Sequence, residues 1–363
     1  MASSFPPLPG DDLKYVIERT RNDWDQMRGG RIFVTGATGF FGVWLLETFA
    51  YANQELGLGA ELLGLTRNPE AFYAKVPHLA SLPDIRLLQG DVRDFKFPEG
   101  TFTHVIHAGT TSGAPVPPLE MLDTIIQGTR RTLDFAVAAR AKRFLFVSSG
   151  AVYGKQSPDI DRIPETYLGG PDTLNPVSSY DEGKRVAEML CHLYHHEHGV
   201  ATTVARSFAL VGPRLPLDAH FAMGNFLRDA MKGEPILVKD GTPERSYLYA
   251  ADLAIWLWTI LFRGTPCHPY NVGSDHAISI SQLAKTVARL TGGTVQLPPT
   301  SQSEASSSDQ LLNFSISQQS APPRPSSRYV PDTNRIMSEL ALEEIIGLEE
   351  AIRRTLHYYT TAA

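Results

Sequence analysis

Short apolar runs alternate with stretches of helical periodicity through the first half of the chain. The strand-like runs are RIFVTG (31–36), ELLGLTR (61–67), IRLLQGD (85–91), THVIHAG (103–109) and RFLFVSS (143–149), and ATTVARSFALVG (201–212) follows one more helical stretch. Strands that alternate with helices in this way build a parallel sheet with helices on both faces. The pattern therefore predicts an α/β fold, a doubly wound parallel sheet of the Rossmann type.

The segments outside this alternation predict the domain organisation. DLKYVIERTRNDWDQM (12–27) has the apolar spacing of an amphipathic helix, so we expect residues 1–30 to form an N-terminal helical extension. Residues 31–211 are the expected dinucleotide-binding domain, and 212–363, where the pattern becomes irregular, a smaller C-terminal substrate-binding region. Residues 299–327 are rich in Ser, Gln and Pro and bury little apolar surface, so we expect a mobile loop there, with a lid role left open.

The composition and charge restrict the kinds of partner and the cellular location that we expect. Its 363 residues are 42% hydrophobic and 20% charged, which is ordinary for a globular protein. A formal net charge of −6 disfavours a nucleic-acid partner, and no segment has the length and hydrophobicity of a membrane span or a secretory signal. Two cysteines, Cys191 and Cys267, make no disulfide framework and no metal site by their spacing. We therefore expect a cytoplasmic protein.

A glycine-rich turn follows the first predicted strand. GATGFFG places Gly36, Gly39 and Gly42 just before a run with helical spacing. In a dinucleotide-binding turn the first glycine permits the tight turn, the second lets the backbone approach a pyrophosphate, and the third lets the helix pack closely. Glycines that serve packing alone are the alternative. We expect the turn to bind a cofactor through Gly36, Thr38, Gly39, Phe40, Phe41 and Gly42.

Tyr180 and Lys184 are spaced as Tyr-x-x-x-Lys in SSYDEGKRVAE. Residues i and i+4 are neighbours on a helix, so the ammonium is expected beside the phenol. Because a nearby positive charge favours the phenolate, we expect it to lower the pKa of Tyr180 and make this residue a proton acceptor. The alternative is an exposed tyrosine with a solvated lysine.

With GATGFFG, RFLFVSSGAVYG and SSYDEGKRVAE in this order, the chain resembles the extended short-chain dehydrogenase/reductase family, and within it the nucleotide-sugar epimerases and dehydratases. The resemblance runs from about Arg31 to the C-terminus, apart from the Ser/Gln-rich loop. It implies that Ser149, four residues before Tyr153, hydrogen-bonds the reacting sugar oxygen. Tyr180 would be the base or acid, and Lys184 would bind the nicotinamide ribose. A homodimer that pairs through the helix of Tyr180 and a neighbouring helix is also implied.

The resemblance further implies which residues bind the ligands. Asp91 in LLQGDVRD resembles the residue that receives the adenine amino group, and HAGTTSG resembles the loop along the cofactor's ribose and phosphates. Arginines suit bidentate contacts to the diphosphate of a nucleotide sugar. The cofactor set thereby gains Asp91, Val92, Ala108, Gly109 and Lys184. The expected substrate set is Thr111, Ser149, Gly150, Asn225, Arg245 and Arg328.

The choice of cofactor depends on the end of the second strand. Thr66 and Arg67 stand where an acid would bond the ribose diol of NAD, and Arg67 suits a 2′-phosphate instead. This favours NADP and leaves NAD open. We expect no metal, because the histidines of HLYHHEHG are interpreted as a solvated helix end; they are His192, His195, His196 and His198.

The chain departs from the family next to Ser149. In the family an Asp-Glu pair follows this position in 4,6-dehydratases and a glutamate in uronate decarboxylases, whereas this chain has Gly150 and Ala151. Ala209 also replaces an asparagine that is common in the family. We therefore expect hydride transfer at C4 of a nucleotide-linked sugar through a 4-keto species, as in an epimerase or a 4-keto reductase.

Two alternatives stay open. A 4,6-dehydratase or uronate decarboxylase would need a displaced acid, with Glu165 and Glu182 as candidates. The alternative from another class is a non-catalytic, dinucleotide-sensing regulator, which has no need for Ser149, Tyr180 and Lys184 together.

Overall fold

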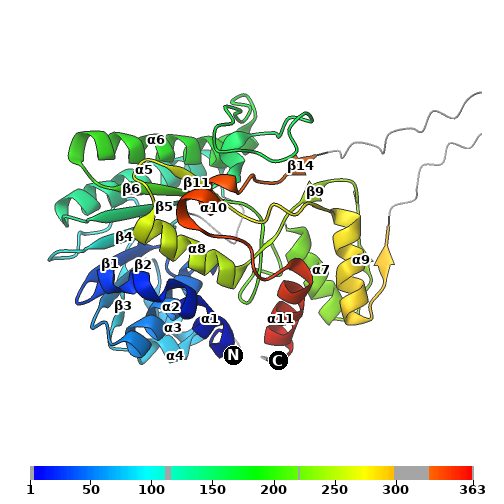
Figure 1. Cartoon of the computed structure of the whole chain (residues 1–363), viewed down its shortest axis with the longest axis horizontal. Coiled ribbons are helices and arrows are strands. Elements are labelled where there is room, and N and C mark those ends of the chain that lie inside the picture. Colours follow the sequence, from blue (N-terminus) through cyan, green and yellow to red (C-terminus); the bar gives the residue numbers. More distant parts are fainter. Residues whose placement is uncertain (1–3, 111–115, 220, 298–326, 362–363) are drawn as a thin grey trace, which may run out of the picture.

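A parallel sheet forms the centre of the computed structural model, which describes residues 4–110, 116–219, 221–297 and 327–361 (Figure 1). Within these residues the sheet has seven strands in the order β11-β6-β5-β4-β1-β2-β3, all parallel. The strands are β1 (Arg31–Thr35), β2 (Glu61–Thr66), β3 (Ile85–Gln89), β4 (His104–His107), β5 (Arg143–Ser149), β6 (Thr202–Ser207) and β11 (Pro269–Val272). The predicted doubly wound α/β fold is confirmed.

Side chains on the strands alternate between two cores, one on each face of the sheet. In β1, Ile32 and Val34 join one core and Phe33 joins the other. The first core is closed by α2 (Phe40–Leu56) and α8 (Ala250–Arg263), and the second by α5 (Pro118–Ala138) and α6 (Ser179–His198), as Figure 1 shows. Strands buried on both faces explain why the runs in the sequence are almost continuously apolar.

The strand order reverses between β1 and β4. The chain leaves β1 toward β2 and β3 on one side, and continues from β4 toward β5 and β6 on the other. In doubly wound sheets, ligands bind in the crevice at the carboxyl ends of the strands beside such a reversal. The glycine turn after β1 and the HAGT segment after β4 meet at this point.

The helix expected before the first strand is present. It is α1 (Gly10–Thr20), continued by η1 (Arg21–Met27), and it packs against α2 and α8. Asp12 on α1 is buried and accepts hydrogen bonds from Tyr249 (2.5 Å) and from Arg354 (2.7 Å) on α11 (Leu348–Thr361). These bonds join the two ends of the chain, which lie close together in Figure 1.

The remaining elements lie mostly beyond residue 211. They are β7 (Leu210–Val211), α7 (Ala222–Met231), β8 (Ile236–Leu237), β9 (Glu244–Arg245), β10 (Leu248–Tyr249), β12 (Ile278–Ser279), α9 (Ile280–Thr291), β13 (Val295–Gln296), β14 (Arg328–Tyr329) and α10 (Asn334–Leu340), with the short helices α3 (Pro69–Lys75), α4 (Pro77–Ala80), η2 (Gly150–Tyr153) and η3 (Pro176–Ser178). A small sheet in the order β12-β9-β14 stands beside the main one.

The domain limits stay a prediction. Although β11 and α8 follow residue 211 in the chain, both belong to the layers of the main sheet. Of the expected loop 299–327, all but Ser327 lies outside the described residues. Among the described helices, none combines the length and hydrophobicity that a membrane span needs.

Candidate active site

The glycine turn has the geometry of a phosphate-binding turn. Gly36 has φ +69°, and a Cβ there would lie 2.4 Å from the carbonyl oxygen of Ala108. A Cβ on Gly42 would lie 2.3 Å from the carbonyl oxygen of Gly36, so packing requires glycine at both positions. At Gly39 the nearest atom would be 3.5 Å away, which leaves room for a ligand.

The start of α2 fits a dinucleotide phosphate. Phe40 and Phe41 are its first residues, and no side chain in the described part of the chain caps it or adds an acidic group to its first turn. The free N–H groups and the positive end of the helix dipole are therefore available to an anion. Thr38 lies half-buried in the turn itself.

The expected adenosine end contains a charge cluster. Thr66 is buried at the end of β2, and Arg67 is exposed beside it. The carboxylate of Asp91 is bound by Arg93, with Nε to Oδ1 at 2.8 Å and Nη2 to Oδ2 at 3.0 Å. Hydrogen bonds from Arg93, with a smaller contribution from the charge of Arg67, lower the pKa of Asp91. Asp91 is thus ionised, and an adenine amino group would have to share its oxygens with Arg93.

A buried histidine, which the sequence analysis did not identify, joins the two strands at the crevice. His107 ends β4, and its Nδ1 lies 2.6 Å from Oγ1 of Thr35 at the end of β1. The same Oγ1 accepts a hydrogen bond of 3.1 Å from the N–H of Gly109, which fixes the loop of Ala108 and Gly109. Burial, together with the charge of Lys184, lowers the pKa of His107 to about 3. This neutral ring therefore has a structural role.

The three expected catalytic residues come together where β5 ends and α6 begins. Ser149 is the last residue of β5, and its Oγ accepts a hydrogen bond of 3.1 Å from the N–H of Ala151. Tyr180, the second residue of α6, is hydrogen-bonded to Ser149. Lys184 is buried one turn further on, and its Nζ lies 5.8 Å from the centre of the Tyr180 ring.

The expected lowering of the pKa of Tyr180 by Lys184 is wrong for the chain without ligands. Burial raises the pKa of Tyr180, the charge of Asp181 adds to this, and only the hydrogen bond to Ser149 opposes it. The Lys184 ammonium donates to the carbonyl oxygen of Val147 at 2.8 Å and faces the phenol ring. Burial also lowers the pKa of Lys184 to about 8. At neutral pH the lysine keeps most of its charge while the phenol keeps its proton.

A second phenol occupies the site, and the sequence analysis did not include it. Tyr329 on β14 is hydrogen-bonded to Ser149, and its hydroxyl oxygen would lie 2.6 Å from a Cβ on Gly150. Its ring packs on that of Phe208, with the centroids 4.5 Å apart. Tyr329 directly follows Arg328, which the sequence analysis did single out. The contact between Tyr329 and Ser149 joins segments that are far apart in the chain, so no local sequence pattern indicates it.

The expected diphosphate arginines lie on neighbouring strands. In the register of β9 and β14, Arg328 pairs with Glu244 and Tyr329 pairs with Arg245. Arg245 donates to Oγ of Ser327 at 3.2 Å, and Arg328 forms an ion pair of 3.3 Å with Glu244. Both arginines are partly buried, and the side chain of Arg328 is 28% exposed.

The other expected ligand-binding residues lie on separate segments of the chain. Asn225 lies on α7, where its Oδ1 accepts a hydrogen bond of 3.1 Å from Arg228. Gly150 lies beside Ser149, as expected from the sequence. Val92, which was expected to contact the cofactor, packs against α5 at Gly128, where a Cβ would lie 2.8 Å from the Val92 side chain. Thr111 lies outside the described residues.

The proposed displaced acids do not contact Ser149. Oε1 of Glu165 accepts the N–H of Asn271 at 2.9 Å, and Glu182 lies 3.5 Å from Arg185. Asp181 is an acid that acts on both phenols, because its charge raises the pKa of Tyr180 and of Tyr329. Burial, with the charge of Glu182, raises its own pKa to about 6.

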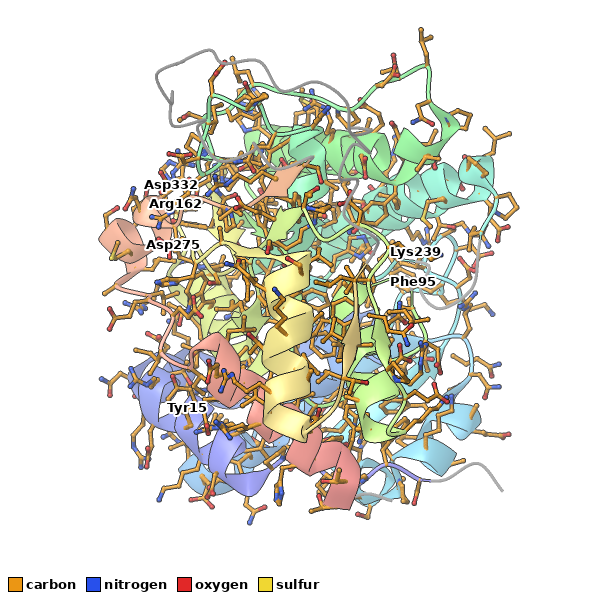
Figure 2. The ribbon with its side chains drawn as sticks, turned by 90° about the vertical axis from the view of Figure 1, so that its right-hand side faces the viewer. Tyr15, Phe95, Arg162, Lys239, Asp275 and Asp332 are labelled. Atoms are coloured by element: carbon orange, nitrogen blue, oxygen red, sulfur yellow. The ribbon has the colours of Figure 1, made fainter. Side chains whose placement is uncertain are left out.

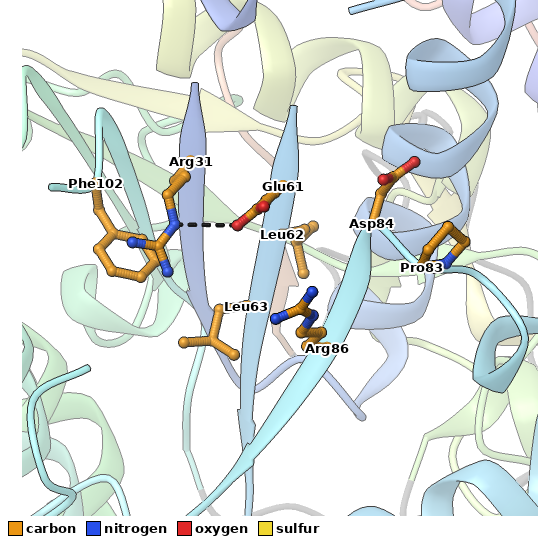
Figure 3. A pocket seen from close by; sticks show the side chains of 8 residues that line it. All are labelled: Arg31, Glu61, Leu62, Leu63, Pro83, Asp84, Arg86 and Phe102. Carbon is orange, nitrogen blue, oxygen red and sulfur yellow. Dashed lines mark ion pairs between the residues drawn. The ribbon is translucent and has the colours of Figure 1, made fainter. Parts of the chain in front are cut away.

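Two other features contain none of the expected site residues. A small pocket at the amino ends of β1 and β2, opposite the carboxyl ends that carry the glycine turn, contains the Arg31–Glu61 ion pair of 3.2 Å (Figure 3). The ligand atoms of Asp275, His276 and Glu344 lie within 4.8 Å of one another. Asp275 already pairs with Arg162 at 2.7 Å, and Figure 2 shows these two on one side of the molecule.

Comparison with known proteins agrees with this geometry. The family model described as NAD dependent epimerase/dehydratase family matches residues 32–273. UDP-glucuronic acid decarboxylase 6 of Arabidopsis thaliana is 30% identical over 287 residues, 78% of this chain and 79% of the relative. UDP-glucuronic acid decarboxylase 1 of Xenopus tropicalis is 28% identical over 360 residues, 98% of this chain and 75% of the relative.

Solved structures match the fold as well. An epimerase from Methanothermobacter thermautotrophicus superimposes with a TM-score of 0.74 at 20% identity, covering 95% of this chain and 96% of the other. UDP-glucuronic acid 4-epimerase from Bacillus cereus, in complex with NAD, gives 0.70 at 18% identity, covering 92% and 99%. The family and these relatives are enzymes, which decides against the dinucleotide-sensing regulator. By its matched family model and its sequence identity to these relatives, the chain belongs to the NAD dependent epimerase/dehydratase family.

Proposed function

We propose that the chain oxidises the C4 hydroxyl of a nucleotide-linked sugar to a 4-keto species. The observation that carries this proposal is the meeting of Ser149, Tyr180 and Lys184 at the end of β5, at the same edge of the sheet as the glycine turn after β1. Tyr180 takes the hydroxyl proton, Ser149 orients the sugar oxygen, and the charge of Lys184 holds the ribose of the cofactor. When bound, NAD or NADP supplies the acceptor for the C4 hydride.

The state of Tyr180 fits a group that both gives and takes a proton. Its raised pKa makes the phenol a donor when a 4-keto group is reduced. Tyr180 becomes an acceptor only when positive charge gathers near its oxygen. Lys184 is a buried cation 5.8 Å from the centre of its ring, and it keeps most of its charge below its pKa of about 8.

For the substrate we propose a UDP-linked uronic acid. The support comes from the relatives, which are UDP-glucuronic acid decarboxylases, and from Arg245 and Arg328, whose planar guanidinium groups suit a diphosphate. A 4-keto uronic acid is a β-keto acid, so loss of carbon dioxide is the second candidate outcome. The first, expected from Gly150 and Ala151, is return of the hydride to C4, as in an epimerase or a 4-keto reductase.

A panel experiment tests these proposals. The protein is incubated with UDP-glucuronate, UDP-glucose and dTDP-glucose, each with NAD or NADP, and products are identified by mass spectrometry and NMR. A 4-keto intermediate, a C4 epimer or a decarboxylated sugar supports C4 oxidation, and absorbance of the reduced nicotinamide separates net reduction from internal return. If no sugar exchanges or loses its C4 hydrogen, the proposal is wrong.

NADP is the cofactor that the second strand favours. Arg67 is exposed beside Thr66 at the end of β2, where it can reach a 2′-phosphate, and no acid follows this strand directly in the sequence. Family relatives in solved structures carry NAD, so the choice is to be measured by titrating both cofactors into the protein.

A homodimer is supported by the surface of α6. Val186, Met189 and Leu193 are exposed at helical spacing, with Met189 59% exposed. Since α5 and α6 pack side by side, this apolar stripe offers a second copy a helical surface. Met189→Glu should convert a dimer to a monomer in light scattering, whereas Lys285→Glu on α9 should not.

A cytoplasmic location is proposed as well, because both cysteines are free thiols, and imaging of a tagged protein tests it.

A further inference from the structure

Tyr329 is held rigidly at the catalytic site by its backbone neighbours. On one side β14 pairs with β9, which places Tyr329 opposite Arg245. On the other side the N–H of Val330 donates to Oε1 of Gln156 at 3.1 Å, and the carbonyl of Val330 accepts from Ile163 at 2.9 Å. A strand fixed along both edges leaves its side chain little freedom to move away.

The side chain of Tyr329 fills the space that residue 150 leaves empty. A Cβ on Gly150 would lie 2.6 Å from the Tyr329 hydroxyl and 2.6 Å from the ring of Phe208. Glycine at 150 is therefore the condition for a phenol beside Ser149. Because Ser149 is hydrogen-bonded to both Tyr180 and Tyr329, three hydroxyl groups meet at the reacting position.

The two phenols have different electrostatic surroundings. Tyr180 has the Lys184 ammonium above its ring. The charged groups around Tyr329 are Asp181, which opposes ionisation, and Arg245, which favours it. Burial is the largest effect, and it raises the pKa of Tyr329. Tyr329 therefore keeps its proton at neutral pH, and with no cation over its ring among the described residues it is suited to donate that proton.

We infer that Tyr329 is the proton donor to C5, the carbon next to the oxidised position. The inference rests on the proposed C4 oxidation, because only a 4-keto group makes C5 able to carry an electron pair. With a uronic acid, the C5–C6 bond breaks, carbon dioxide leaves, and the electron pair forms the C4–C5 enolate. The Tyr329 O–H bond then breaks, its proton adds to C5, the C4 ketone is restored, and the phenolate regains a proton from water.

The two residues that follow Ser149 offer no acid, and Asp181, the acid whose charge acts on both phenols, is on α6 next to Tyr180. Gly150 and Ala151 carry no titratable group, and Glu165 is engaged with the N–H of Asn271. The phenol is already placed against Ser149 and needs no rearrangement of the backbone. With a sugar that has no carboxylate, no bond to C5 breaks, so C5 should keep its hydrogen after C4 is oxidised.

The test is Tyr329→Phe, which keeps the ring against Phe208 and removes the hydroxyl. Its matched control is Tyr167→Phe, which removes a phenol from the same aromatic cluster. Both variants and the wild type are incubated in deuterated water with UDP-glucuronate and, separately, UDP-glucose. Deuterium at C5 is followed by NMR, carbon dioxide by release from labelled substrate, and C4 oxidation by reduced-nicotinamide absorbance.

We expect Tyr329→Phe to slow deuterium entry at C5 by about 10²–10⁴-fold, the usual contribution of a general acid, and to slow C4 oxidation far less. Tyr167→Phe should change neither rate. Gly150→Ala, which pushes the Tyr329 hydroxyl away, should reproduce the C5 defect. Equal loss of both steps, an unaffected C5 rate, or a wild type that oxidises C4 of UDP-glucuronate without deuterium entry at C5 would overturn the inference. A wild type that never oxidises C4 contradicts the proposed function itself.

Discussion

The Lys184 ammonium donates a hydrogen bond of 2.8 Å to the carbonyl oxygen of Val147. Val147 lies two residues before Ser149 on β5, and Lys184 lies one helical turn after Tyr180 on α6. The bond thus joins the strand that carries the serine to the helix that carries the tyrosine. It also directs the positive charge toward the sheet, so Lys184 does not offset the burial and the charge of Asp181 that raise the pKa of Tyr180.

Replacing Tyr180 with phenylalanine should remove C4 chemistry. The ring stays in place and the proton acceptor is lost, so we expect the rate of C4 oxidation to fall by about 10²–10⁴-fold. Cofactor binding should persist, because the glycine turn is untouched. Single-turnover kinetics with an accepted sugar, together with a cofactor titration, measures both.

The matched control is Tyr194→Phe on the same helix. Its hydroxyl bonds Asp134 at 2.5 Å at the molecular surface, so its loss should leave the rate of C4 oxidation unchanged. Less than tenfold loss in the Tyr180 variant would show that another group takes the proton.

The charge of Asp181 should set the pH at which Tyr180 becomes a base. A neighbouring negative charge disfavours the phenolate and raises the pKa of Tyr180, so removing it lowers that pKa. In Asp181→Asn the rising limb of the pH–rate profile for C4 oxidation should therefore move to lower pH. Below about pH 6, where Asp181 is itself protonated, the two profiles should converge.

Glu182→Gln is the control for this prediction. Glu182 adjoins Asp181 in the chain but turns toward Arg185, at 3.5 Å, and it is not among the causes that shift the pKa of Tyr180. Above about pH 6, where Asp181 is ionised in both proteins, its profile should follow the wild type. A limb that moves equally in both variants would show a general charge effect on α6.

The parts of the site that depend on local sequence could be predicted, and those that depend on distant segments could not. The glycine turn is one segment, and Gly36 and Gly42 are required by contacts within it and with Ala108. Tyr180 and Lys184 lie one helical turn apart. Tyr329 reaches Ser149 only because β14 pairs with β9 after a crossover in the chain.

The electrostatics of the site were hidden for the same reason. The spacing of Tyr180 and Lys184 predicts their proximity but not the burial that raises the pKa of one and lowers that of the other. Asp91 was expected to face adenine. Its hydrogen bonds with Arg93, two residues later in the chain, depend on the conformations of both side chains, which the sequence does not contain. Burial is a property of the whole fold, so no local pattern contains it.

The N-terminal helix should contribute to the stability of the whole domain. Asp12 is buried and bonds Tyr249 and Arg354, whereas Asp11 beside it is exposed. Asp12→Ala leaves the buried Tyr249 hydroxyl unpaired, and Arg354 keeps Glu350 as a partner. We expect a loss of about 1–3 kcal/mol in the free energy of unfolding, measured by urea denaturation. Asp11→Ala removes an equivalent first-turn charge and should cost less than about 1 kcal/mol; equal losses would mean that the buried bonds add nothing.

Arg67 should decide which cofactor binds. It is exposed at the end of β2 next to Thr66, and its charge contributes to the lowered pKa of Asp91, which places it near the expected adenosine end. If it binds a 2′-phosphate, Arg67→Ala should weaken NADP by on the order of 1.5–3 kcal/mol, roughly 10–150-fold in Kd, and leave NAD nearly unchanged. Arg67→Asp should change the preference to NAD, because a carboxylate there can accept hydrogen bonds from the two ribose hydroxyl groups. Calorimetric titration of both cofactors measures this, with Arg86→Ala, an exposed arginine on β3 that lines the pocket in Figure 3, as the control. Equal weakening of NAD and NADP by Arg67→Ala would show that the guanidinium stacks on adenine and reads no phosphate.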